Sequence, residues 1–210
     1  GAGYPLAKAA ERIMVGKLMN AGQTCIAPDY VLVPAGSEEA FLAAAREVVA
    51  RCYPDLGNTP DYTAIVNDRH YQRLAGYVED ARVRGARIEP LSAAGADATR
   101  RKMAPLALLG VNDSMQVMQD EIFGPLLPVL PYRDIGEAIA WVNDHPRPLA
   151  LYCFDNDGAQ RDRVLEETVA GGVTVNDTIL HIAQENLPFG GVGPSGMGHY
   201  HGKEGFDTFS

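Results

Sequence analysis

The sequence predicts an α/β protein, a three-layer sandwich around a mainly parallel β-sheet. Short apolar runs alternate with segments whose apolar residues recur at helical spacing, which is typical of βαβ units. The apolar runs are nearly continuous, as expected for strands that are covered on both faces. The connections are long enough for right-handed crossovers between parallel strands.

Helices are expected where apolar periodicity coincides with capping residues. The first follows Pro5, which suits a first helical turn, and ends at Asn20-Ala21-Gly22, because glycine favours the left-handed conformation that ends a helix. Ser37 and Asp134 are expected N-caps. In chain order, the expected helices cover 6–19, 37–52, 68–84, a stretch that begins at Asp134, and 157–167.

The apolar runs between these helices are the expected strands. They cover 30–33, 88–91, 104–111, 129–132, 149–154 and 173–176. Cys52 falls on the apolar stripe of the 37–52 helix, and Cys153 falls inside a strand. Both are therefore predicted to be core thiols, whereas residues 93–101 are small, polar and charged and are expected to form a surface loop.

Composition excludes several classes of protein. The 210 residues are 46% hydrophobic and 21% charged, an ordinary globular balance for which one domain is the expected count. The net charge of −9, without a basic stripe, argues against nucleic-acid partners and against an anionic membrane surface. No run reaches transmembrane length. Three scattered cysteines argue against a disulfide framework or zinc ribbon and predict a reducing, cytoplasmic location.

Cys25 is the candidate nucleophile of the chain. It lies in the connection between the first helix and the first strand, and the preceding Gly22-Gln23-Thr24 leaves the sulfur little shielded. The alternative is a buried packing residue, since free cysteine is often buried. This run alone favours packing, and residues elsewhere in the chain decide between the two interpretations.

The glycine-rich tail contains a misleading motif. Residues 191–196 satisfy G-x-G-x-x-G, but no strand precedes them, and Pro194 removes a backbone N–H that a phosphate would need. Five glycines in nine residues instead predict an irregular loop with positive φ angles and close backbone approach. His199 and His201 lack a third ligand at a recognisable spacing, so no metal site is expected.

Glu121 and Phe123 form a second candidate site, followed by a Gly124-Pro125 bend. A carboxylate accepts hydrogen bonds from paired hydroxyls such as those of a ribose, and an aromatic ring packs against a flat heterocycle. Taken alone, this segment reads more simply as an exposed acid and a core phenylalanine.

Three runs together resemble the aldehyde dehydrogenase superfamily over nearly the whole chain. They are Gly22-Gln23-Thr24-Cys25, residues 121–125, and residues 188–193 with Tyr200-His201-Gly202. The resemblance implies that Cys25 attacks an aldehyde carbonyl to give a thiohemiacetal, which passes hydride to NAD or NADP and leaves a thioester for hydrolysis. It also implies that the Cys25 N–H holds the oxyanion, that Glu121 binds the nicotinamide ribose, and that Phe123 packs beside the nicotinamide ring.

The tail and residues 147–152 resemble the branch that holds fatty and coniferyl aldehyde dehydrogenases, and residues 176–181 most resemble its coniferyl members. The implied partners are a small-molecule aldehyde and further copies of the chain in a homo-oligomer. The family's coenzyme-binding half and its Glu-Leu-Gly-Gly motif do not occur in the sequence. Residues 1–210 are therefore expected to be the cysteine-bearing catalytic domain, with little activity by itself.

Three alternatives remain open at the level of sequence. One is a long-chain aliphatic aldehyde as substrate, and another is a non-catalytic oligomerisation module with a vestigial cysteine. The third is a cysteine hydrolase, which would need a base such as His181, His199 or His201 near the thiol, but none of the five histidines lies in a recognisable hydrolase context.

Overall fold

The computed structural model describes residues 1, 3–93, 95 and 97–210. The chain packs as two compact units. Residues Leu6–Pro131 form the thiol unit, and Gly1–Pro5 with Tyr132–Ser210 form the tail unit. Each helix within the described ranges is too short or too polar to span a bilayer.

A four-stranded sheet forms the centre of the thiol unit, in the order β1-β4-β3-β2. Its strands are β1 (Val31–Pro34), β2 (Arg87–Pro90), β3 (Leu106–Leu109) and β4 (Leu126–Tyr132). β3 runs parallel to β4, with Leu106 opposite Leu126, whereas the edge strand β2 is antiparallel to β3. The prediction of an α/β fold with a mainly parallel sheet is confirmed, although the edge strand β2 is antiparallel to its neighbour.

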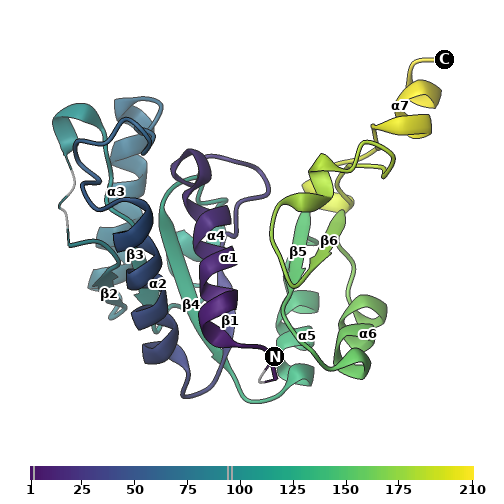
Figure 1. Cartoon of the computed structure of the whole chain (residues 1–210), viewed down its shortest axis with the longest axis horizontal. Coiled ribbons are helices and arrows are strands. Elements are labelled where there is room, and N and C mark those ends of the chain that lie inside the picture. Colours follow the sequence, from purple (N-terminus) through teal and green to yellow (C-terminus); the bar gives the residue numbers. More distant parts are fainter. Residues whose placement is uncertain (2, 94, 96) are drawn as a thin grey trace. The chain divides into compact units, whose positions relative to one another are not determined.

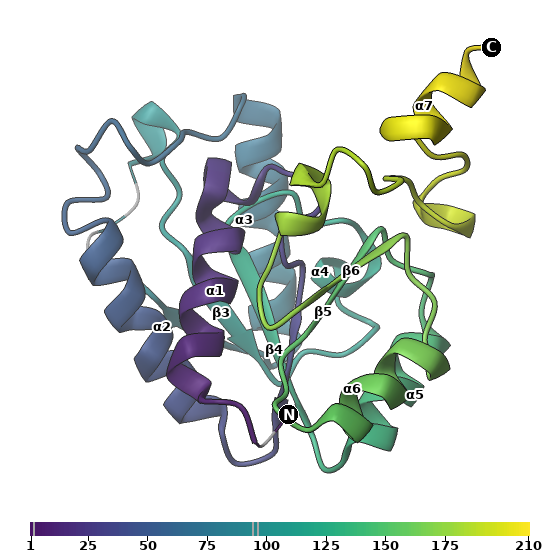
Figure 2. The ribbon, with the colours of Figure 1, turned by 45° about the vertical axis from the view of Figure 1, so that its right-hand side comes forward.

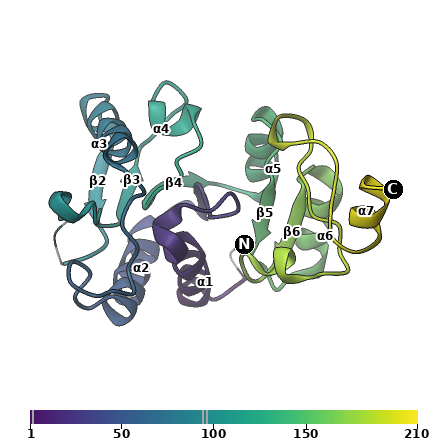
Figure 3. The ribbon, with the colours of Figure 1, turned by 90° about the horizontal axis from the view of Figure 1, so that it is seen from above.

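Helices cover both faces of this sheet, as the sandwich prediction requires. They are α1 (Leu6–Leu18), α2 (Glu38–Cys52), α3 (Asp68–Val83) and the single turn α4 (Gln116–Gln119), with short 3-10 turns η1 (Met19–Gly22) and η2 (Ala98–Arg100). α1 and α2 pack side by side on one face (Figures 1 and 2), and α3 and α4 lie on the other (Figure 3). The inward residues of α3 are the four that periodicity predicts, namely Leu74, Tyr77, Val78 and Ala81.

Cys52 contradicts its prediction as a core thiol, because its side chain is exposed. The other predicted members of the stripe, from Phe41 to Val49, are buried. Cys52 is the last residue of α2. Periodicity identifies the inward face of a helix but not how far the neighbouring elements extend along it, so the final turn carries its thiol into solvent. Residues 94 and 96 of the predicted 93–101 loop lie outside the described residues.

The tail unit contains a two-stranded parallel sheet of β5 (Ala150–Cys153) and β6 (Gly172–Val175). Its helices are α5 (Ile135–Asp144), α6 (Gly158–Glu167) and α7 (Gly202–Thr208), with 3-10 turns η3 (Leu180–Ala183) and η4 (Gly193–Ser195). Cys153 packs with Ile139 of α5 and Val164 of α6. Its prediction as a core thiol is confirmed.

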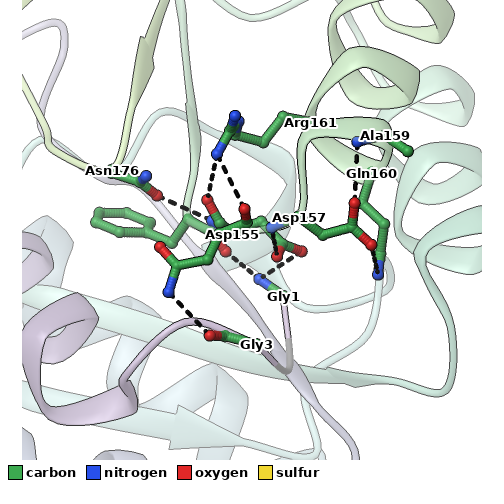
Figure 4. Close-up of polar contacts among 10 residues, drawn as sticks. Gly1, Gly3, Asp155, Asp157, Ala159, Gln160, Arg161 and Asn176 are labelled. Atoms are coloured by element: carbon green, nitrogen blue, oxygen red, sulfur yellow. Dashed lines mark hydrogen bonds and ion pairs between the residues drawn. The ribbon is translucent and has the colours of Figure 1, made fainter.

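A buried aspartate joins the two strands of the tail unit to α6 (Figure 4). The Asp155 N–H donates to the Asn176 Oδ1 at 2.9 Å, and the Asp155 Oδ1 accepts the Asp157 N–H at 2.9 Å. Asp157 then caps α6 by accepting the Ala159 N–H, also at 2.9 Å. Arg161 returns from α6 to the Asp155 carbonyl at 3.2 Å, so these contacts fix where α6 begins relative to the ends of β5 and β6.

The glycine-rich loop has the conformation that its composition predicts. Gly193, Gly196 and Gly198 have φ of 60°, 145° and 77°. A Cβ on Gly190 would lie 2.1 Å from the Gly198 carbonyl oxygen, so only glycine allows this approach. Residues Gly193–Ser195, in the middle of the G-x-G-x-x-G run, form the short turn η4.

Candidate active site

The loop that carries Cys25 begins with three consecutive left-handed residues. Asn20, Ala21 and Gly22 have φ of 52°, 53° and 77°, which turns the chain sharply after α1, as the helix-ending signal predicts. The Ala27 N–H donates to the Thr24 carbonyl at 3.0 Å and closes a turn around Cys25. The Cys25 side chain is exposed, so the packing interpretation is not supported.

The side chain of Gln23 holds this loop in place. Its Nε2 donates to the Asn20 carbonyl at 3.0 Å and to the Ala64 carbonyl at 3.1 Å. Its Oε1 accepts the Val66 N–H at 2.9 Å. A single amide thus satisfies three backbone groups and ties the residue two positions before Cys25 to a distant segment.

The segment that carries Glu121 and Phe123 lies between α4 and β4. Ile122 is fully buried and anchors it, while Glu121 is exposed. Phe123 has φ of 49°, unusual for a bulky residue, and its side chain is 39% exposed. Strained residues of this kind persist where the surroundings fix them, and they occur often at functional sites. The interpretation of Phe123 as a core residue is therefore not supported.

The structure brings the Cys25 loop and the Glu121 segment together. A Cβ on Gly22 would lie 2.3 Å from the Gly124 carbonyl oxygen, so the two backbones touch where Gly22 lacks a side chain. The Asp29 Oδ1 accepts the Ile122 N–H at 3.1 Å. Residues 22–29 around Cys25 are called the thiol loop here, and both of its ends, Gly22 and Asp29, contact the segment that carries Glu121.

Three ionisable groups at these loops and on α1 influence one another's pKa. Lys17 is 1% exposed on the inward face of α1, and within the described part of the chain its Nζ has no hydrogen-bond partner. Burial lowers the pKa of Lys17 from 10.5 to about 8, and the nearby Asp29 opposes this change. Burial raises the pKa of Asp29, against the charge of Lys17. Desolvation and the charge of Asp29 raise the pKa of Glu121 in turn.

Sequence reasoning missed Lys17, Gln23, Asp29 and Arg73. For Lys17 a signal was present, because a lysine that lies three residues after Met14 on the apolar stripe of an amphipathic helix is out of place there. Gln23 lies within the run that singled out Cys25. Asp29 accepts a hydrogen bond from Ile122, and Arg73 donates to the carbonyls of Glu121 and Ile122. These partners are far away in sequence, so nothing local distinguishes Asp29 or Arg73.

Glu121 and Phe123 expose two side chains whose chemistry is compatible with a dinucleotide. The strained turn exposes a carboxylate and an aromatic ring two residues apart, which suits ribose hydroxyls and a flat heterocycle. Within the described residues, no three His, Cys, Asp or Glu side chains are grouped so that they could hold a metal ion.

The chain is therefore a mixed α/β protein that carries an exposed cysteine on a loop held by contacts to backbone groups of other segments. Residues 3–210 match the family model described as the aldehyde dehydrogenase family. The chain therefore belongs to the aldehyde dehydrogenase family, and the resemblance drawn from its three motifs is confirmed.

Individual aldehyde dehydrogenases show how similar this chain is to other members of the family. A probable coniferyl aldehyde dehydrogenase of Pseudomonas aeruginosa is 59% identical over 206 residues, which are 98% of this chain and 43% of that protein. Staphylococcus aureus AldH in a substrate-bound state superposes with a TM-score of 0.91 at 41% identity, covering all of this chain and 45% of that one. A Mycobacterium tuberculosis aldehyde dehydrogenase complexed with NAD+ gives 0.84 at 26% identity, covering 99% and 43%. The chain thus spans less than half the length of these proteins.

Proposed function

We propose that residues 1–210 form the cysteine-bearing catalytic part of an enzyme that oxidises an aldehyde to the carboxylic acid with NAD or NADP. The observation that carries the proposal is the exposed Cys25 in a loop packed through Gly22 and Asp29 against the Glu121 segment. The NAD+-bound relative supports the choice of coenzyme class.

In this mechanism the Cys25 thiolate attacks the carbonyl carbon and forms a thiohemiacetal. Among the described residues, the Cys25 N–H donates to no protein oxygen, so it is available to the developing oxyanion. Bound NAD or NADP supplies a hydride acceptor. Loss of hydride from the thiohemiacetal leaves a thioester on Cys25, and water then releases the acid and restores the thiol.

Glu121 and Phe123 are proposed to orient the coenzyme. The carboxylate of Glu121 would accept hydrogen bonds from the ribose hydroxyls, and the exposed ring of Phe123 would pack beside the nicotinamide. Both side chains project from one strained turn, so their relative orientation is set before any ligand arrives.

The first test replaces the thiol in the complete gene product. We expect Cys25→Ser to lower aldehyde-dependent reduction of NAD or NADP by several orders of magnitude, because the nucleophile is lost. Cys52→Ser is the matched control, since that thiol is also exposed, and it should retain activity. Equal activity of the two variants would overturn the role of Cys25.

Coniferyl aldehyde, or a similar aromatic aldehyde, is the proposed substrate, in line with the Pseudomonas aeruginosa relative. The alternative is a long-chain aliphatic aldehyde. The ratio of kcat/KM for coniferyl aldehyde to that for a long alkanal decides between them, and a strong preference for the alkanal would exclude the aromatic assignment.

A non-catalytic module remains distinguishable from an enzyme by thiol reactivity. If Cys25 is the nucleophile, iodoacetamide at neutral pH should label it faster than Cys52. Cys153 should react most slowly, because it is buried and burial raises its pKa. Peptide mass spectrometry measures the three rates separately. Equal rates for Cys25 and Cys52 would favour the module.

A further inference from the structure

We propose that Arg73 is a positioning residue that fixes the backbone of Glu121 and Ile122 for coenzyme binding. This inference rests on the proposed function and adds a residue to it that lies on α3, outside the three recognised motifs. Arg73 is half-buried, and it reaches from the helix to the segment that carries the coenzyme-binding candidates.

The guanidinium of Arg73 donates to two successive carbonyls of that segment. Its Nη2 lies 2.7 Å from the Ile122 carbonyl oxygen, and its Nη1 lies 3.3 Å from that of Glu121. The planar fork of arginine can donate in several fixed directions at once, which the single ammonium of lysine cannot reproduce. Arg73 therefore holds two peptide groups in one orientation.

Tyr77, one turn further along α3, completes the contact. The Arg73 guanidinium lies 5.0 Å from the centre of the Tyr77 ring, and its Nη1 donates to the Tyr77 hydroxyl at 3.0 Å. That hydroxyl donates to the Asp120 Oδ2 at 2.8 Å. Three successive residues, 120 to 122, are thus held from the same helix.

The other side of this segment is held from the thiol loop. Asp29 accepts a hydrogen bond from the Ile122 N–H, and Arg73 donates one to the Ile122 carbonyl. Ile122 is thus fixed through both of its backbone polar groups. The next residue is Phe123, whose left-handed backbone is unfavourable by itself. The contacts of Arg73 and Asp29 account for how this conformation persists.

The charge of Arg73 also suits the carboxylate that it positions. Desolvation and Asp29 raise the pKa of Glu121, whereas Arg73 lowers it. Arg73 thereby favours the ionised form, which only accepts hydrogen bonds and can take both hydroxyls of a ribose. The positional effect and the electrostatic effect act in the same direction.

The experiment measures coenzyme affinity and thiol reactivity separately in the complete gene product. NADH or NADPH, whichever the wild type binds more tightly, is titrated by its fluorescence. We expect Arg73→Met to weaken binding about tenfold, since charge-assisted hydrogen bonds are lost, and Arg73→Lys to fall between Arg73→Met and the wild type. The iodoacetamide labelling rate of Cys25 should stay within about twofold of the wild type.

Two variants on the same helix sharpen the result. Arg69→Met removes an exposed arginine of α3 and should bind coenzyme as the wild type does. Tyr77→Phe keeps the ring beneath the guanidinium but removes the hydroxyl, and it should give a smaller loss than Arg73→Met.

Each outcome bears on one claim. Equal coenzyme affinity in Arg73→Met and Arg69→Met, with an active wild type, would overturn the positioning role alone. A parallel change in Cys25 labelling and coenzyme affinity would also overturn it, because a general loosening of the fold would then explain both. A wild type that oxidises no aldehyde would overturn the proposed function instead.

Discussion

Replacing Gly22 with alanine tests whether close backbone contact holds the thiol loop against the Glu121 segment. The new Cβ would lie 2.3 Å from the Gly124 carbonyl oxygen and 2.7 Å from its carbon, and both are backbone atoms. Neither atom can rotate away as a side chain would. The two loops must therefore move apart, or the fold must take up the strain.

The cost has two parts. Gly22 has φ of 77°, and an alanine in the left-handed region costs roughly 1–2 kcal/mol. Overpacking of a close contact adds about 1–3 kcal/mol. We therefore expect Gly22→Ala to lower the free energy of unfolding by about 2–5 kcal/mol, a large fraction of the 5–15 kcal/mol typical of natural proteins.

Gly36→Ala is the matched control. Gly36 has φ of 84°, but a Cβ there would meet nothing within 4 Å, so only the conformational part of about 1–2 kcal/mol applies. Urea denaturation of both variants isolates the contact term as their difference. If Gly22→Ala and Gly36→Ala are equally destabilised, the two loops do not meet at Gly22 and our account of the site is refuted.

Four further substitutions are tested through the free energy of unfolding. Because the pKa of Lys17 falls from 10.5 to about 8 on folding, the unfolded chain binds more protons between these values, so stability should rise from pH 8 to 10.5. Lys17→Met should remove that rise, and a slope that survives in the variant would rule out this source. Asp134→Ala should cost about 1 kcal/mol, because Asp134 accepts the Glu137 N–H at the start of α5. Ser37→Ala should cost less than about 0.5 kcal/mol, because the Ser37 side chain makes no capping hydrogen bond. Equal losses at the two caps would contradict the geometry. Tyr62→Phe should cost about 1–3 kcal/mol by leaving a buried carbonyl, which now accepts from the Tyr62 hydroxyl at 2.8 Å, without a partner. A neutral effect would show that water satisfies this carbonyl.

Most helices were predictable because the residues that start, end and orient a helix lie close together in the sequence. The helix expected over 68–84 is observed as Asp68–Val83, with the four expected residues inward. Strand pairing is less accessible, because partners lie far apart in sequence. β2 pairs antiparallel with β3, and β4 begins at Leu126, three residues before the expected start at Val129. Pro128 lies just before the expected strand, yet in the structure it pairs opposite Leu108 within β4.

The candidate site was predictable only in part, for the same reason. Cys25 lies in a recognisable motif, and Glu121 with Phe123 in another, so sequence identifies both halves. What sequence could not supply is the means by which the two halves are joined. The Asp29 contact to Ile122 links residues 93 positions apart, and the Arg73 contact to Ile122 links residues 49 apart. Such contacts exist only once the fold has formed.

The amide of Gln23 makes the geometry of the thiol loop depend on residues 64–66 as well as on its own sequence. Protein engineers who transplant this nucleophile into another scaffold would need to carry that stretch with it. An insertion or deletion there would be transmitted to the sulfur without altering any neighbouring residue in the chain.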